Sequence, residues 1–156
     1  MDAEVWPDER VTGLVEDNFL PARLHVKDDA ADFKRFGENF GAHWTPTILF
    51  LDPQGIEHYR IEGFLPVDDF LAQLNLGLGH LAFQAGRFDE AGEYFQTVVN
   101  EYSTTEGAPE GQYWAGVSRY KSSGDAAALA ETALAFDARY QDSSWAKKAS
   151  VWKPAA

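Results

Sequence analysis

The sequence predicts an α/β domain over residues 1–84 and an all-helical extension over residues 85–156. Two observations predict this order. Thr47–Leu51 is an uncharged apolar run of the kind found in strands buried on both faces, and a turn and an alternating segment follow it. After Pro66 the apolar residues recur only at helical spacing. We therefore expect every strand to lie in the first half of the chain.

The composition is that of an acidic chain without cysteine. Its 156 residues include 13 Lys and Arg, 25 Asp and Glu and no Cys, which gives a formal net charge of −12. Hydrophobic residues make up 45% of the chain, a fraction that argues against disorder. Without cysteine, these residues supply no disulfide, no cysteine-ligated metal and no thiol nucleophile.

The charge pattern also limits the expected partners and location. No cluster of Lys and Arg offers a basic face, so we expect no binding to nucleic acid or to an anionic membrane surface. No apolar stretch is long enough to span a membrane, and the acidic residues after Met1 are not typical of a leader. We expect a soluble, cytoplasmic protein, and the question of a leader upstream of Met1 stays open.

Residues 2–41 predict two helices with a short strand between them. Pro7 interrupts the helical pattern of residues 2–19, and Asp8 stands where a residue would cap the part that follows. Arg23–Val26 has the pattern of a strand. The second helix is expected from Asp28 to about Gly41.

A β-hairpin follows these elements. The strand Thr47–Leu51 leads into Asp52-Pro53-Gln54-Gly55, which has Pro and Gly at turn positions. Ile56–Ile61 then alternates as expected for a half-solvated partner strand, and Gly63 ends it.

The rest of the chain predicts helices only. Apolar residues at helical spacing, separated by breaks at Gly86, Ser103–Pro109, Gly124 and Gln141-Asp142, predict five helices. Their approximate ranges are 67–85, 88–102, 109–122, 125–140 and 143–151.

The helical half contains an internal repeat at an offset of 38 residues. Six positions match, as the pairs Gly86/Gly124, Ala91/Leu129, Phe95/Ala133, Tyr102/Tyr140, Ala108/Ala146 and Trp114/Trp152. The spacing of Leu78-Gly79, Ala82, Gly86, Ala91 and Tyr102 resembles a tetratricopeptide repeat, which is a helical hairpin. A stabilising cap for the α/β half and a partner-binding surface are equally good interpretations.

Trp44-Thr45-Pro46-Thr47 and the hairpin after it resemble the thioredoxin superfamily, and the resemblance extends over residues 1 to about 84. It implies a cis bond before Pro46, in a loop that faces the redox site. It also implies a C-x-x-C motif at the start of the first helix, where the helix N-terminus stabilises a thiolate. In this sequence Met1 already lies inside that helix, so the resemblance places the cysteines, and a central strand between Arg23–Val26 and Thr47–Leu51, upstream of Met1.

Two explanations for the missing motif stay open. One is truncation, which removed the central strand and the redox motif. We favour it because an apolar strand without its neighbour exposes an edge that binds other chains. The other is a redox-inactive descendant that rebuilt its sheet. In its intact form the protein is then a thiol–disulfide oxidoreductase, although these 156 residues are redox-inactive. The alternative is a non-catalytic protein–protein interaction module, so whether the protein is an enzyme stays open.

The expected binding residues are Trp44, Thr45 and Pro46, which the resemblance places on one side of a peptide groove. There the backbone of residue 45 could pair with an extended protein or peptide partner. The open strand edge further predicts a strand-exchanged homodimer. We expect no catalytic residue and no cofactor in this chain. We also expect no metal site, because the four histidines are scattered, at positions 25, 43, 58 and 80.

Overall fold

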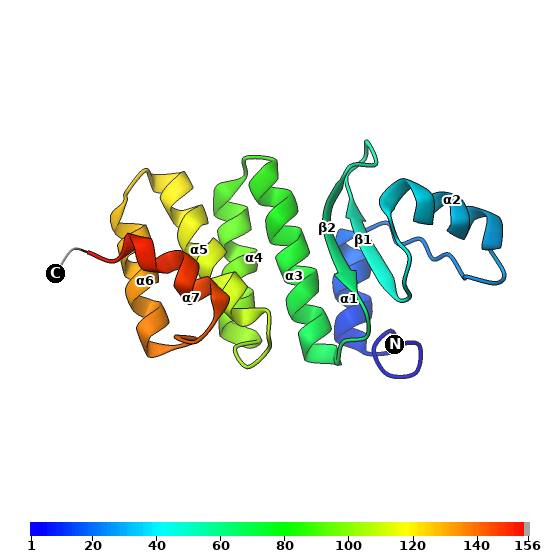
Figure 1. Cartoon of the computed structure of the whole chain (residues 1–156), viewed down its shortest axis with the longest axis horizontal. Coiled ribbons are helices and arrows are strands. Elements are labelled where there is room, and N and C mark those ends of the chain that lie inside the picture. Colours follow the sequence, from blue (N-terminus) through cyan, green and yellow to red (C-terminus); the bar gives the residue numbers. More distant parts are fainter. Residues whose placement is uncertain (155–156) are drawn as a thin grey trace. The chain divides into compact units, whose positions relative to one another are not determined.

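The structure is a computed structural model that describes residues 1–154. The chain forms two compact units, Met1–Phe70 and Leu71–Ala156, and the boundary falls within α3 (Val67–Gln84). Figure 1 shows the one pair of strands in the described part of the chain before α3 and only helices after it. The predicted order of an α/β region and a helical region is therefore confirmed. The domain boundary between residues 84 and 85 stays a prediction.

The first unit contains α1 (Glu9–Asn18), α2 (Ala30–Phe40) and the strands β1 (Thr47–Leu51) and β2 (Glu57–Glu62). Asp8 caps α1 as predicted, since its side chain accepts a hydrogen bond from the Arg10 amide at 2.9 Å. Both predicted helices form and start later than expected, since residues 2–7 make turns before α1 and α2 starts at Ala30 and not at Asp28.

The two strands pair antiparallel, with Thr47 opposite Glu62 and Phe50 opposite Tyr59. The turn between them is the predicted Asp52–Gly55 segment, in which Gly55 has a φ of 79° that favours glycine. The ring of Phe50 is buried, with the Tyr59 ring at 5.5 Å and the Phe19 ring at 5.3 Å. These contacts hold the hairpin and the end of α1 together.

The predicted strand Arg23–Val26 is wrong, because the structure places no strand there. The backbone groups of His25, which a neighbouring strand would have to bind, are hydrogen-bonded locally instead. The His25 amide donates to the Asp29 carboxylate at 2.7 Å, and the His25 carbonyl accepts from the Asp29 amide at 2.9 Å. This turn leads directly into α2 and replaces extended backbone.

The second unit is built from helical hairpins. After α3 come α4 (Phe88–Glu101), α5 (Ala108–Ser123), α6 (Ala127–Ala138), α7 (Ser144–Ala149) and a short 3₁₀ helix, η1 (Ser150–Trp152). The five predicted helices are confirmed, with bounds that shift by a few residues. Within this unit, Figure 1 shows that α4, α5 and α6 lie side by side in sequence order.

Glycines allow two pairs of these helices to approach closely. A Cβ at Gly79 would lie 2.5 Å from the Phe95 ring, where α3 meets α4. A Cβ at Gly116 would lie 2.7 Å from the Cβ of Thr132, where α5 meets α6. At both contacts, therefore, only glycine leaves room for the neighbouring helix.

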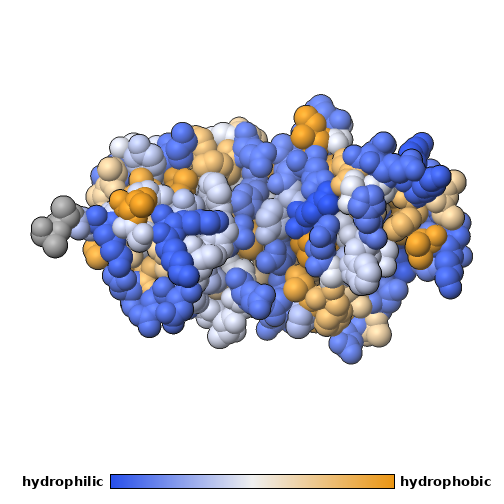
Figure 2. Space-filling view, viewed as in Figure 1, coloured by the Kyte–Doolittle hydropathy of each residue, from blue (hydrophilic) through white to orange (hydrophobic). Residues whose placement is uncertain are grey.

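The visible face in Figure 2 is dominated by hydrophilic side chains, with apolar residues in small scattered patches. No helix in the described residues is both long and apolar enough to cross a membrane.

Candidate functional site

The candidate site is the loop His43–Pro46 between α2 and β1. The chain enters it through a tight turn after α2, in which Gly41 is left-handed with a φ of 62°. The Ala42 amide donates back to the Gly37 carbonyl at 3.0 Å, and a Cβ at Gly37 would lie 2.9 Å from the Ala42 oxygen. The close return of the backbone determines where the loop begins.

Arg60 of β2 fastens this turn to the sheet. Its Nη2 donates to the Phe40 carbonyl at 2.6 Å, and its guanidinium binds both carboxylate oxygens of Glu57 at 2.6 Å. Glu62 accepts a further hydrogen bond at 3.1 Å. The hydrogen bonds to Glu57 and Glu62 raise the pKa of Arg60, and the partner Arg60 lowers the pKa of Glu57. The bidentate contact with Glu57 thus fixes the Arg60 side chain on β2, and its hydrogen bond to Phe40 attaches the turn to that strand.

The loop presents its first two predicted site residues to solvent. Trp44 is 70% exposed, Thr45 is exposed and Pro46 is half-buried. The Thr45–Pro46 peptide bond is cis in this structure. Two carbonyls of the loop have partners: that of Trp44 accepts from the Thr47 hydroxyl at 2.7 Å, and that of Pro46 accepts from the Gly63 amide at 2.8 Å. The chain therefore brings the three predicted residues together in one exposed stretch.

The hydrogen bond between Pro46 and Gly63 determines which backbone groups of β1 face β2. In an antiparallel pair, hydrogen-bonded positions alternate along the strand. The Pro46 carbonyl is hydrogen-bonded to β2, so by this alternation the N–H and C=O groups of Ile48 and Phe50 also face β2. The N–H and C=O groups of Thr47, Leu49 and Leu51 then face away from β2, toward an edge where the described residues place no second strand. Thr45 precedes this row by two residues, so the exposed loop leads directly into the open edge.

Leu49 and Leu51 were not predicted from the sequence as members of this edge. The available signal was the alternation of a strand, which separates odd from even positions. Alternation alone does not reveal whether the backbone groups of the odd or of the even positions face β2. Only the observed register reveals this.

The turn of the hairpin holds the ion pair of Asp52 and His58. His58 Nε2 lies 2.8 Å from Asp52 Oδ2, and the amides of Gln54 and Ile56 donate to Oδ1, each at 2.9 Å. These bonds, first of all the one from His58, lower the pKa of Asp52. The pair stabilises the turn after β1, and this structural role accounts for both side chains.

No metal site is evident in the part of the chain that the structure describes, where no three His, Cys, Asp or Glu side chains gather. His80 illustrates the scatter of the histidines, since it pairs with Glu110 at 2.9 Å within the helical unit. There the His80 ring packs on Phe95 and Trp114, at 5.2 and 5.0 Å between ring centres. It therefore contributes to the packing of the helices.

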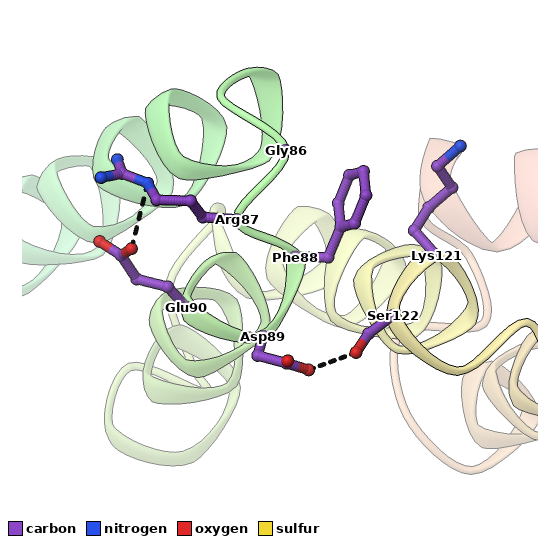
Figure 3. A pocket seen from close by; sticks show the side chains of 7 residues that line it. All are labelled: Gly86, Arg87, Phe88, Asp89, Glu90, Lys121 and Ser122. Atoms are coloured by element: carbon purple, nitrogen blue, oxygen red, sulfur yellow. Dashed lines mark hydrogen bonds and ion pairs between the residues drawn. The ribbon is translucent and has the colours of Figure 1, made fainter.

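The helical unit has a shallow surface hollow of about 420 Å³, which is lined by Gly86–Glu90, Lys121 and Ser122 (Figure 3). Its charged groups have partners within the chain. Arg87 pairs with Glu90 at 3.2 Å, and Ser122 hydrogen-bonds to Asp89. Lys121 lies over the Phe88 ring, with Nζ 5.5 Å from its centre. The hollow therefore presents no converging set of free groups.

Comparison with known proteins agrees with the geometry of the first unit. The family described as thioredoxin-like domain matches residues 1–77. Neither the curated proteins nor the solved structures include a significant match to the chain.

Proposed function

We propose that the chain binds an extended polypeptide along the loop Trp44–Pro46 and the open edge of β1, as a member of the thioredoxin-like family, whose description matches residues 1–77. The observation that carries the proposal is the row of backbone groups at Thr47, Leu49 and Leu51, which face away from β2 and follow the exposed loop directly.

Strand addition explains why this row suits a polypeptide. An added strand takes its affinity from main-chain hydrogen bonds and its selectivity from pockets for alternate side chains. Residues 43–51 carry no Lys, Arg, Asp or Glu, so no fixed charge has to lose its water when a strand binds. The exposed ring of Trp44 adds a large apolar contact at one end. We therefore assign the polypeptide an uncharged stretch of about five residues, the length of β1.

Trp44→Ala tests the loop. We expect it to lower affinity for bound peptides about tenfold, because exposed aromatic anchors contribute much of the binding energy at such sites. The free energy of unfolding should change by less than about 0.5 kcal/mol, since the side chain is largely in solvent. The measurement is binding of the labelled chain to an array of random ten-residue peptides, followed by fluorescence anisotropy on the strongest sequences.

Val151→Ala is the control, because Val151 is an apolar residue of the helical unit that is 81% exposed. It should leave peptide binding unchanged. An array on which the unmodified chain binds nothing above the Trp44→Ala background would contradict the proposal.

The family match favours thiol–disulfide exchange as a second candidate. The chain has no cysteine and so no redox thiol, and the exchange requires a thiolate that attacks a substrate disulfide. That activity would depend on cysteines outside these 156 residues.

In an insulin-reduction assay we expect this chain to show only the background rate, because it has no thiol to attack the insulin disulfides. The same assay on a chain extended at its N-terminus separates the two functions. Reduction by the extended chain would establish the oxidoreductase, and a background rate there would leave polypeptide binding.

We also propose that the helical unit is built from tetratricopeptide-like hairpins. Two contacts support this. Gly79 approaches Phe95 and Gly116 approaches Thr132, so in each hairpin a glycine meets the residue sixteen positions later. The equal spacing indicates that α3–α4 and α5–α6 repeat one packing arrangement.

A further inference from the structure

The open edge of β1 lacks the charged side chains that the neighbouring strand β2 carries. Natural sheets guard an edge strand with charged side chains, because exposed backbone groups otherwise pair with another chain. Glu57, Arg60 and Glu62 supply such charges on β2. The five residues of β1, by contrast, are uncharged.

We propose that a second copy of this chain occupies the open edge of β1, with the two β1 strands antiparallel about Leu49. The two strands then form the centre of a four-stranded sheet. This inference concerns the same edge as the proposed polypeptide site, and at β1 the two occupants exclude each other.

The backbone of β1 is self-complementary in this arrangement. Leu49 pairs with Leu49 of the second copy, and Thr47 pairs with Leu51 of the second copy. These are the residues whose N–H and C=O groups face away from β2, so all of them gain partners at once. A symmetric interface of this kind closes as a dimer and leaves no further edge of β1 to extend it.

Charge favours β1 as the contact between copies. Each copy carries a net charge of −12, so most pairs of surfaces would bring carboxylates together. Residues 43–51 have no Lys, Arg, Asp or Glu, and two such strands meet without an ionised like-charge pair. The strand is thus a neutral surface on an acidic molecule.

Sedimentation tests the dimer directly. Over about a hundredfold range of concentration, the unmodified chain should sediment with twice the monomer mass at the upper end. Leu49→Pro should sediment as a monomer, because proline lacks the N–H that faces the second copy and leaves the bonds to β2 intact. Leu49→Thr shortens the same side chain but keeps the N–H, and it should remain dimeric.

Cross-linking provides a second readout that does not depend on the proline variant. Because the chain has no cysteine, one introduced thiol reports one position. Leu49→Cys should form a disulfide-linked dimer under mild oxidant, and Glu62→Cys on β2 should stay largely monomeric. An unmodified chain that is monomeric throughout, or equal cross-linking of the two variants, would overturn the dimer while leaving the peptide-array result unaffected.

Discussion

Phe95→Ala is expected to lower the free energy of unfolding of the helical unit by about 3–5 kcal/mol, the range for truncating a buried phenylalanine. The Phe95 side chain is fully buried, and its ring centre lies 5.2 Å from that of His80 and 6.2 Å from that of Trp114. The ring also fills the space beside Gly79. Truncation leaves a cavity between α3, α4 and α5 that backbone movement closes only in part.

Urea unfolding monitored by tryptophan fluorescence measures this loss. Leu134→Ala is the control, because Leu134 is a helical residue that is 52% exposed, and its effect should stay within about 0.5 kcal/mol. Should Phe95→Ala unfold the chain entirely, Phe95→Leu provides a smaller truncation at the same site. A loss below about 1 kcal/mol for Phe95→Ala would show that the ring is not central to the packing of this unit.

Gly116→Ala is expected to destabilise the chain by about 2 kcal/mol, within the usual range for an overpacked core. The added Cβ would lie 2.7 Å from both Cβ and Cγ2 of Thr132, and nearer still to its hydroxyl oxygen. Because the Thr132 Cβ is attached to the backbone of α6, relief requires α5 and α6 to move apart. The gain in helix propensity from Gly to Ala, about 1 kcal/mol, is too small to offset this.

Gly92→Ala separates the cost of overpacking from the gain in helix propensity. Gly92 also lies inside a helix, α4, but the nearest neighbour of its added Cβ is the Ser118 Cβ at an ordinary 3.6 Å. We expect this variant to be as stable as the unmodified chain or more stable by up to about 1 kcal/mol. Equal thermal unfolding curves for the two alanine variants would contradict the close approach of α5 and α6.

The candidate site was predictable in one part only. Trp44, Thr45 and Pro46 were identified from their resemblance to a known family, and the structure places them together before β1. Leu49 and Leu51 were missed as parts of the edge. Their contribution is backbone, and the sequence pattern of a strand does not reveal which neighbour each backbone group meets.

The sequence by itself determined the helices from Val67 to Ala149, the hairpin turn at Asp52–Gly55 and the absence of a redox thiol. Helices and tight turns satisfy their backbone groups within a few residues, so local spacing predicts them. The tertiary structure alone decided that Arg23–Val26 is not a strand and that the backbone groups of Thr47, Leu49 and Leu51 are the ones that face away from β2. A strand bonds to a partner elsewhere in the chain, and here the Asp29 carboxylate takes the His25 amide that a strand partner would need.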